Sequence, residues 1–368
     1  NIICNVPHLR FPEFTEEWVN VSLKDVADFQ KERISSGLLD ESTYISTENI
    51  LQNFQGVQSA ISIPANTNVV AYKKNDILLS NIRPYLKKAW FSDRIGGCSA
   101  DVFVLRSKTC EPEFLYNVIA SDKFINYVMS GAKGVKMPRG DKNQMESFSF
   151  SIPAVVEQRK ISRLFQLLDE RIVTQNKIIE DLKKLKSAIS ERLLKGVKGS
   201  TVLLSDICDI VKGKQINGEN LSESGNYYVM NGGTELSGYY DDYNVEANTI
   251  SISEGGNSCG YVQFNTSPFW SGGHCYSIQD ITDNVDNLYL YHYLKSKEDA
   301  IMKLRIGSGL PNIQKKDLAM FKIKIPAVEQ QLKISIFLSS LERKAEIEER
   351  IQNALLKEKQ YLLHQMFI

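Results

Sequence analysis

Three groups of residues in this chain have types and spacings that could do chemistry. They are the D-x-K tripeptide Asp181, Leu182 and Lys183, the neighbours His274 and Cys275 with Cys259 upstream, and the dipeptide of Gly213 and Lys214. A D-x-K pattern occurs in nuclease sites, and His and Cys side chains bind zinc. A GK dipeptide occurs in loops that hold the phosphates of a nucleotide.

Each pattern lacks something that its chemistry requires. Leu182 lies on the apolar stripe of an expected helix, so Asp181 and Lys183 are expected to be solvated charges. A zinc site needs four convergent ligands, so His274 is expected to pack in the core. The GK dipeptide continues with Gln215, and no two prolines are adjacent, which excludes a nucleotide-binding loop and the N-P-P-[YF] motif of adenine methyltransferases. The sequence therefore predicts no catalytic, metal or cofactor site.

The segments that must position any site occur twice in the sequence. The phrase IPAVVEQRKIS at 152–162 returns as IPAVEQQLKIS at 325–335, with eight of eleven positions identical. The two copies differ by 173 in residue number, and we call this difference the repeat offset. The same offset aligns further residues, such as Gly134 with Gly307. Solenoid repeats have periods of about 20 to 50 residues, so this chain is expected to hold two copies of a whole domain.

A long helix is expected after each copy of the phrase. Residues 155–194 contain neither Gly nor Pro, and apolar side chains recur three and four positions apart. The resulting stripe is narrow and is interrupted by Gln175 and Lys186, and the second copy places Glu348 at the position of Gln175. Narrow stripes require a partner helix, so the two helices are expected to pack against each other in antiparallel orientation.

The regions before the helices are expected to mix helices and strands. Runs such as DVFVLRS and NTISISE are typical of strands, and PEFLYNVIASDKFINYVMSG is typical of helices. The expected fold class is α+β, with two mixed α/β domains related by pseudo-twofold symmetry and separated by two long antiparallel helices that form a coiled-coil spacer. The expected boundaries are 1–151 and 199–324 for the domains, and 152–198 and 325–368 for the helices.

Charge is balanced over the whole chain but uneven along it. The 368 residues carry 44 basic and 44 acidic side chains. Only the helical segments are basic, with 11 basic and 6 acidic residues in 151–198 and 8 and 6 in 321–368, whereas 199–320 carries 8 and 15. A protein that binds nucleic acid by neutralising phosphates is usually more basic, so charge alone does not predict a DNA-binding protein.

The remaining composition indicates a cytoplasmic protein. No run of about 18 apolar residues is present, and the first residues lack a basic stretch followed by an apolar core, so neither a membrane span nor a signal peptide is expected. The six cysteines are far apart and form no C-x-x-C pair, as in reduced cytosolic proteins. No disulfide framework and no membrane partner are expected.

Three stretches resemble the DNA specificity (S) subunit of type I restriction-modification systems. They are GSGLPNIQKKDLAMFKIKIPAVEQQLKI at 307–334, its degenerate partner at 131–161, and LRFPEFTEEW at 9–18. The resemblance spans the whole chain, and its specific feature is the doubled P-x-x-x-x-Q phrase that enters a long helix. It implies two target-recognition domains, each reading one half of a split DNA sequence, and helices that set the gap and dock methyltransferase subunits.

The resemblance also implies the partners. They are double-stranded DNA and methyltransferase (M) subunits in two copies, while the presence of restriction (R) subunits stays open. S-adenosylmethionine and ATP are expected only on partner subunits, and the chain itself is expected to be no enzyme. Methyltransferase subunits that surround the DNA share the phosphate contacts, which reconciles a nearly neutral chain with DNA binding.

Within this resemblance, four loop segments carry side chains that can read base edges. Arg, Lys, Asn and Gln present donors and acceptors, and nearby glycines let a backbone approach closely. The candidates from segments 80–88 and 133–142 are Asn81, Arg83, Tyr85, Lys87, Lys88, Lys133, Lys136, Arg139 and Lys142. Those from segments 253–260 and 303–316 are Asn257, Lys303, Arg305, Asn312, Gln314, Lys315 and Lys316. For any single residue, a solvated surface role is an equal alternative.

A second reading belongs to another class of protein, a coiled-coil scaffold whose end domains bind other proteins. It accounts equally well for the helices, the neutrality and the acidic second half. Exposed aromatic anchors, in place of Lys, Arg and Asn beside glycines, would favour it. An enzyme with an unrecognised site is a third reading.

Overall fold

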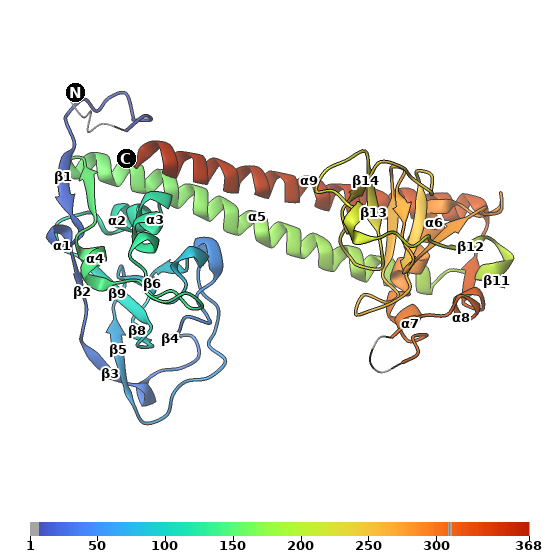
Figure 1. Ribbon diagram of the computed structural model, residues 1–368, viewed down its shortest axis with the longest axis horizontal. Coiled ribbons are helices and arrows are strands. Elements are labelled where there is room, and N and C mark those ends of the chain that lie inside the picture. The colour runs from blue at the N-terminus through green and yellow to red at the C-terminus, as the bar shows by residue number, and fades with distance from the viewer. Residues whose placement is uncertain (1–6, 308, 310, 368) are drawn as a thin grey trace. The chain divides into compact units, whose positions relative to one another are not determined.

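The structure is a computed structural model that describes residues 7–307, 309 and 311–367, so Cys4 lies outside the described residues. Its internal contacts divide the chain into two units, Asn1–Gln175 with Ile351–Ile368, and Asn176–Arg350. We call them the first and the second unit and describe each by itself. Both mix helices and strands, as predicted (Figure 1). The predicted boundaries of domains and helical segments stay a prediction.

The first unit contains two four-stranded sheets. One is antiparallel and has the order β2 (Ala27–Phe29), β9 (Val102–Ser107), β6 (Ile77–Ser80) and β7 (Ala89–Phe91). The other has the order β3 (Arg33–Ser35), β5 (Asn68–Tyr72), β8 (Gly96–Cys98) and β4 (Tyr44–Ile45), with β4 parallel to β8. All four positions of β6 are buried, which explains why its sequence ILLS lacks a polar face.

Short helices and a strand pair complete the first unit. The helices are α1 (Leu23–Val26), α2 (Pro112–Ile119), α3 (Asp122–Ser130) and α4 (Lys142–Glu146), and β1 (Val19–Ser22) pairs with β10 (Ser149–Ile152). The Ser121 hydroxyl accepts the Phe124 N–H (3.3 Å) at the start of α3, as an N-cap does. Phe114 of α2 and Phe124 of α3 are fully buried in one core cluster with Trp18 and Leu105.

The second unit repeats this plan. Its main sheet has the order β12 (Asp209–Lys212), β18 (Cys275–Gln279), β15 (Thr249–Ser253) and β16 (Val262–Asn265). A smaller sheet joins β14 (Tyr239–Tyr240), β13 (Tyr227–Met230) and β17 (Trp270–Ser271), and β11 (Ser200–Leu203) pairs with β19 (Lys322–Ile325). The helices that precede the repeated phrase are α6 (Asn287–Ser296), α7 (Glu298–Met302) and α8 (Lys315–Ala319).

The strand register shows that the repeat is structural. Ile77 of β6 pairs with Leu105 of β9 in the first unit, and Ile250 of β15 pairs with Ile278 of β18 in the second. Both members of the second pair are related to those of the first by the repeat offset. A one-residue slip would turn every side chain to the opposite face of the sheet, so a shared register means a shared core. The predicted duplication of a whole domain is confirmed.

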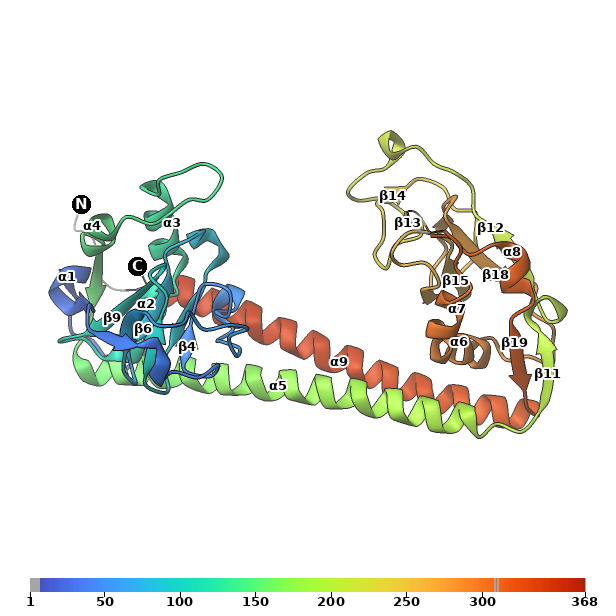
Figure 2. The same ribbon diagram turned by 90° about the horizontal axis from the view of Figure 1, so that it is seen from below.

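The two long helices also follow the sequence prediction. α5 (Val155–Lys195) has 41 residues and α9 (Val328–Met366) has 39. In the second unit, Figure 2 shows β11 and β19 side by side where α5 ends and α9 begins. In the first unit, the end of α9 returns to the core, where the Phe367 ring lies 5.3 Å from that of Phe114 and 5.8 Å from that of Phe165 (Figure 1).

Within each unit the two helices run antiparallel and share an ion pair. Lys359 Nζ lies 2.5 Å from Asp169 Oδ1 in the first unit, and Lys186 Nζ lies 2.5 Å from Glu342 Oε1 in the second. The repeat offset relates Asp169 to Glu342 and Lys186 to Lys359. The polar interruption of the stripe at Lys186 is therefore half of a repeated pair, and Gln175 is buried.

The glutamine of the repeated phrase fastens each domain to its helix. Gln158 Oε1 accepts the N–H of Glu111, the residue before α2, and Gln158 Nε2 donates to the Pro153 carbonyl (both 2.8 Å). Gln331 Oε1 likewise accepts the N–H of Asp286, the residue before α6, at 2.8 Å, and its Nε2 donates to the Pro326 carbonyl at 2.9 Å. Both glutamines are 1% exposed or less. The phrase is repeated because each copy of the domain uses the same pair of glutamine hydrogen bonds.

Candidate nucleic-acid interface

In the first unit the two predicted loop segments, 80–88 and 133–142, lie against each other. The Arg83 N–H donates to the Pro138 carbonyl (2.8 Å), and the Gly140 N–H donates to the Asn81 carbonyl (3.1 Å). Segment 133–142 begins as a tight hairpin in which Lys133 and Arg139 exchange backbone hydrogen bonds of 3.0 and 2.9 Å. We call these two segments the first loop pair.

The second unit builds the second loop pair, segments 253–260 and 303–316, with the same bonds. The Gly256 N–H donates to the Pro311 carbonyl (3.0 Å), and the Ile313 N–H donates to the Glu254 carbonyl (2.8 Å). The repeat offset relates each of these partners to its counterpart in the first unit. The two halves of the chain therefore present equivalent loop pairs, which the sequence grouped only by composition.

In each loop pair a glycine follows the first member of a bonded backbone pair, Lys133 with Arg139 in the first unit and Ile306 with Asn312 in the second. Gly134 has a φ of +95° and Gly307 has a φ of +103°. These φ values lie in the left-handed region, which residues with a side chain rarely adopt, so both positions favour glycine. Gly134 and Gly307 thus align at the repeat offset because both positions have a left-handed backbone.

The candidate side chains of the first loop pair fall into two groups. Arg83, Tyr85, Lys133, Lys136 and Arg139 are exposed, whereas Asn81, Lys87, Lys88 and Lys142 are half-buried. The half-buried lysines are bound within the unit: Lys87 Nζ lies 2.5 Å from Asp122 Oδ1, Lys88 Nζ donates to the Thr47 carbonyl at 2.7 Å, and Lys142 Nζ lies 3.4 Å from Glu146 Oε1. The exposed group is the one available to a ligand.

Two of these residues hold a left-handed backbone. Arg83 has a φ of 51° and Lys87 has a φ of 53°, and they flank the 3-10 turn η3 (Pro84–Leu86). Residues with a side chain rarely adopt this conformation, and it is found disproportionately at functional sites. The turn places the Arg83 and Tyr85 side chains at the surface.

All seven candidates of the second loop pair are exposed. They are Asn257, Lys303, Arg305, Asn312, Gln314, Lys315 and Lys316. Beneath them, the buried Glu254 carboxylate accepts the Tyr276 hydroxyl (3.0 Å) and pairs with Lys212 Nζ (2.7 Å). Burial, and hydrogen bonding to Glu254, raise the pKa of Tyr276, so this hydroxyl stays protonated and can donate.

Sequence reasoning missed two residues at the loop pairs, Asp101 and His274. The Asp101 carbonyl accepts the Asn81 N–H (2.8 Å), and the His274 carbonyl accepts the Glu254 N–H (2.9 Å), so the repeat offset relates these bonds too. The prediction that His274 packs in the core is wrong, because this side chain is exposed where β18 begins, whereas the adjacent Cys275 is buried. Comparing positions at the repeat offset could have identified both residues from the sequence.

Charge is arranged differently in the two loop pairs. Arg139 Nη1 lies 3.0 Å from Asp101 Oδ1, and Lys133 Nζ lies 2.7 Å from Asp141 Oδ2. The hydrogen bond between Lys133 and Asp141 raises the pKa of the lysine and lowers that of the carboxyl group, so both are ionised at neutral pH. At the positions of Asp101 and Arg139, the second unit has His274 and Asn312.

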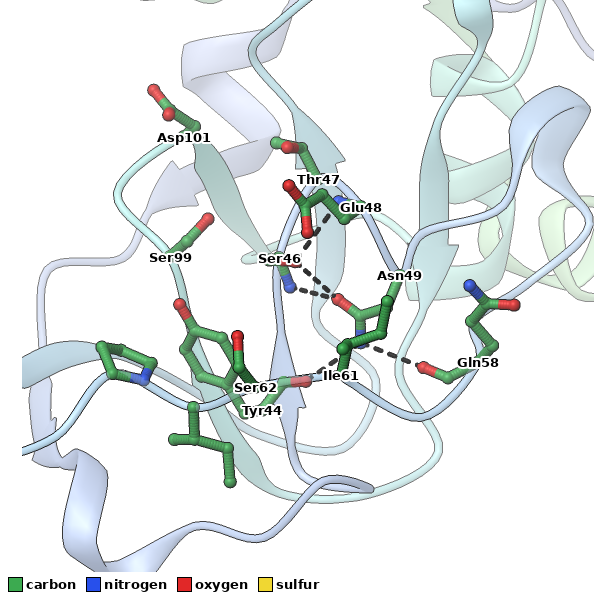
Figure 3. A pocket seen from close by; sticks show the side chains of 12 residues that line it. Tyr44, Ser46, Thr47, Glu48, Asn49, Gln58, Ile61, Ser62, Ser99 and Asp101 are labelled. Carbon is green, nitrogen blue, oxygen red and sulfur yellow. Dashed lines mark hydrogen bonds between the residues drawn. The ribbon is translucent and has the colours of Figure 1, made fainter. Parts of the chain in front are cut away.

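A polar cavity of about 370 Å³ is lined in part by Asp101, whose side chain pairs with Arg139 of the first loop pair. Its lining includes Asp101, Ser99 and Glu48, and Figure 3 shows the Asp101 side chain apart from the other side chains drawn. The buried Asn49 side chain is committed to structure, since its Nδ2 donates to the Tyr44 and Gln58 carbonyls (3.0 Å each). The polar groups that face the cavity therefore include two carboxylates, which suit a donor group better than a phosphate.

The other sequence-derived expectations have these outcomes in the described part of the chain. Asp181 and Lys183 are exposed on α5, as predicted, and Lys183 pairs with Glu349 (2.6 Å). The five described cysteines are free and buried. Within the described ranges, no group of three or more His, Cys, Asp or Glu side chains could hold a metal ion. No described helix has the length and apolar character of a membrane span.

Comparisons with known proteins agree with this architecture. A family model described as type I restriction modification DNA specificity domain matches residues 15–184 and 197–357. A putative type I specificity subunit of Mycoplasma pneumoniae is 31% identical over 145 residues, which are 39% of this chain and 38% of that protein. The type I restriction enzyme MjaVIII specificity subunit of Methanocaldococcus jannaschii is 24% identical over 409 residues, covering 97% of this chain and 92% of that one.

Coverage of the relatives differs widely. The match spans 38% of the length of the Mycoplasma pneumoniae protein and 31% of that of a second putative type I specificity subunit, from Mycoplasma genitalium. Among solved structures, the S subunit of a type I restriction-modification system from M. genitalium superposes with a TM-score of 0.70 at 17% identity, over 99% of both chains. A chain from a study of complex assembly in the type I system gives a TM-score of 0.60 at 19% identity, over 95% and 96%.

At these identities the solved structures establish the fold, and the family model establishes the kinship. The model matches both halves of the chain separately, in agreement with the two structural repeats. This chain belongs to the family of type I restriction-modification DNA specificity subunits.

Proposed function

We propose that this chain is the sequence-reading subunit of a type I restriction-modification complex, in which each loop pair reads one half of a bipartite target in double-stranded DNA. The observation that carries the proposal is the equivalence of the two loop pairs, which the same backbone bonds fix at positions related by the repeat offset. Equivalent scaffolds with different side chains are what two related but distinct half-sites require. Backbone bonds hold the loops, which leaves the exposed side chains for the bases.

The side chains of the loop pairs support DNA as the ligand. They supply Arg, Lys, Asn and Gln, which hydrogen-bond base edges and phosphates. The four segments contain a single aromatic residue, Tyr85, so they lack the aromatic anchors typical of protein-binding surfaces. The alternative of a coiled-coil scaffold with protein-binding end domains is therefore disfavoured.

Partner subunits supply the chemistry in this proposal. The chain contributes no catalytic group, and methyltransferase subunits, with S-adenosylmethionine, modify the DNA that it selects. Two such subunits dock on the helices α5 and α9, which also set the gap between the half-sites. ATP is bound by restriction subunits where these join the complex. The solved structure concerned with complex assembly in the type I system has a related fold, which supports association with partners.

Coexpression tests the proposal. The chain is produced together with a methyltransferase subunit of a type I system that co-purifies with it, in cells without other DNA methylation. The methylated positions of the genome are then sequenced. We expect one motif of two fixed half-sites separated by a gap of fixed length, and no methylation by either subunit alone. Methylation by the purified chain alone, or a continuous motif, would contradict the proposal.

A further inference from the structure

The Asp101–Arg139 ion pair marks the point where the first loop pair meets the start of β9. Arg139 Nη1 lies 3.0 Å from Asp101 Oδ1, and the two side chains are 53% and 38% exposed. The backbones of both residues are fixed, since Asp101 accepts from Asn81 (2.8 Å) and Arg139 exchanges two bonds with Lys133. A guanidinium and a carboxylate thus stand side by side, accessible and on a rigid base.

Such a pair contributes little to folding. Water screens exposed charges, and holding two side chains together costs conformational entropy. Its effect is on orientation, because the planar guanidinium has donors in a fixed fork and an adjacent carboxylate limits its rotation. A fork that is already oriented loses less entropy when it binds a flat, bidentate acceptor.

One base pair has the complementary pattern. In the major groove, guanine presents the acceptors N7 and O6, and its partner cytosine presents the N4 amino donor beside them. Arginine supplies two donors, and the aspartate beside it supplies an acceptor. We propose that Asp101 and Arg139 together read a G·C base pair of the first half-site: Arg139 donates to guanine O6 and N7, and Asp101 accepts from cytosine N4. This inference rests on the proposed function.

The surroundings of Asp101 agree with this role. Asp101 lines the polar cavity together with Glu48, and Figure 3 shows its carboxylate apart from the other side chains drawn. Two carboxylates at this place would repel a phosphate, whereas an amino group of a base edge is a suitable donor for them. A phosphate-binding role for Arg139 would gain nothing from the neighbouring Asp101.

The second unit provides an internal comparison. Its equivalent positions hold His274 and Asn312, which present neither a guanidinium fork nor a carboxylate. Because the backbone bonds around them are the same as in the first unit, the difference lies in the side chains alone. The preference for G·C at this position is therefore confined to the first half-site.

Two conservative variants separate base reading from charge. Arg139→Lys keeps the positive charge and loses the fork, and Asp101→Asn keeps the shape and removes the acceptor charge. Lys108→Arg and Asp28→Asn are matched controls, because this exposed pair (3.2 Å) lies at the opposite end of β9. At about 3.3 Å per residue, that end is roughly 15 to 20 Å from Asp101.

The readout is the relative affinity of the assembled complex for every single-base variant of its target, from sequencing of bound and unbound DNA pools. We expect Arg139→Lys to reduce discrimination at one G·C pair of one half-site. The expected loss is roughly 5- to 150-fold, the range for one bidentate contact. Asp101→Asn should reduce discrimination at that same pair without weakening binding to unrelated DNA, because it removes a negative charge. The control variants should match the wild type.

Failure of this inference differs from failure of the proposed function. If the wild-type complex selects a bipartite target but Arg139→Lys leaves every position unchanged, or weakens all sequences equally, Arg139 contacts a phosphate or solvent and the inference is wrong. If Asp101→Asn only raises affinity for all DNA, Asp101 is no base reader. If the wild-type complex has no sequence preference, the proposed function itself fails.

Discussion

Gln158 and Gln331 show how a single residue type can fix the relation between a domain and its helix. Each side chain uses its carbonyl oxygen and its amide nitrogen at once, joining the residue before a domain helix to the proline of the repeated phrase. Glutamine is suited to this because it carries a donor and an acceptor on one planar group. Both amides are buried.

Replacing Gln331 by Leu should therefore destabilise the second unit. The change leaves the half-buried Asp286 N–H and the buried Pro326 carbonyl without this partner. This costs about 2 to 3 kcal/mol in the free energy of unfolding. Gln330→Leu is the matched control, because Gln330 is exposed and a surface change there should stay within about 0.5 kcal/mol. Urea denaturation of both variants measures the difference. Equal stability of the two variants would show that the glutamine hydrogen bonds are dispensable.

Arg83 should display opposite effects on folding and on binding. Its φ of 51° is unfavourable for a residue with a side chain, and glycine adopts this conformation without that penalty. Arg83→Gly should thus raise the free energy of unfolding by about 1 kcal/mol or less, while affinity for DNA falls because an exposed guanidinium is lost. Thermal unfolding and DNA titration of the same preparation test both directions. A variant that binds as well as the wild type would remove Arg83 from the interface.

His292 predicts a pH dependence of stability. Burial lowers the pKa of His292 to about 4, although the nearby Glu342 acts in the opposite direction, and Ser339 bonds its ring at 2.9 Å. The unfolded chain, with a pKa of about 6.5, takes up a proton first, so stability falls as the pH drops from 6.5 toward 4. Between pH 7 and pH 5 the loss is roughly 2 kcal/mol. Urea unfolding at pH 7 and pH 5 should show that His292→Gln lacks this loss of stability. If the variant loses as much stability as the wild type, other groups cause the pH dependence.

The residue types of the loops are plain in the sequence, but the geometry of the loops was only partly predictable. Segments 80–88 and 133–142 were grouped by residue type, and the structure does bring them together. That Lys87 and Lys88 are bound inside the unit could not be predicted, because Asp122 and Thr47 are distant in sequence. Whether any candidate touches a base stays a prediction.

At the scale of elements, the helices α5 and α9 carry ion pairs where an apolar stripe alone would be expected. Lys186 and Glu342 are 23% and 29% exposed, and Tyr291 also donates to Glu342 (3.1 Å). A partly buried charge that loses its partner is costly, because little water can replace it. These pairs therefore constrain which residues of the helices face each other within a unit.

Glu342→Gln should lower the free energy of unfolding by about 1 to 2 kcal/mol, because Lys186 then keeps its charge in a half-buried place without the carboxylate. Glu180→Gln is a suitable control, since Glu180 and Lys184 form a pair with 63% and 70% exposed side chains. Its removal should leave the free energy of unfolding close to that of the wild type, because water screens exposed charges. A double-mutant cycle with Lys186→Met isolates the coupling. Coupling no larger than in the exposed pair would mean that the interruption of the stripe has no structural role.

Periodicity and the repeat predicted the elements well. Both long helices and the duplicated domain followed from the absence of Gly and Pro and from the repeat offset. The ion pairs were invisible to this reasoning, because a lysine on a stripe looks like a defect until its partner on another helix is known. His274 was misassigned for a related reason: β18 begins after it, and an exposed strand end resembles a strand interior in sequence.

At the scale of the whole molecule, we propose that the helices set the gap between the half-sites. The division into units falls after Gln175 in α5 and after Arg350 in α9. Inserting four residues at both points lengthens both helices by about 6 Å and turns them by roughly 40°, so the apolar stripes nearly realign. At about 3.4 Å per base pair, the gap in the methylated motif should grow by one or two base pairs. An active variant with the original gap would show that the helices do not set it.

We expect the two loop pairs to read their half-sites independently. Arg139→Ala and Asn312→Ala remove equivalent residues from the first and the second loop pair, and sequencing of the methylated sites of each complex reveals which half of the motif changes. We predict that each variant relaxes one position in one half-site, by about 1 to 3 kcal/mol, and that the two variants affect different halves. If both variants change the same half, or if each weakens methylation uniformly at all sites, the loop pairs do not read half-sites independently.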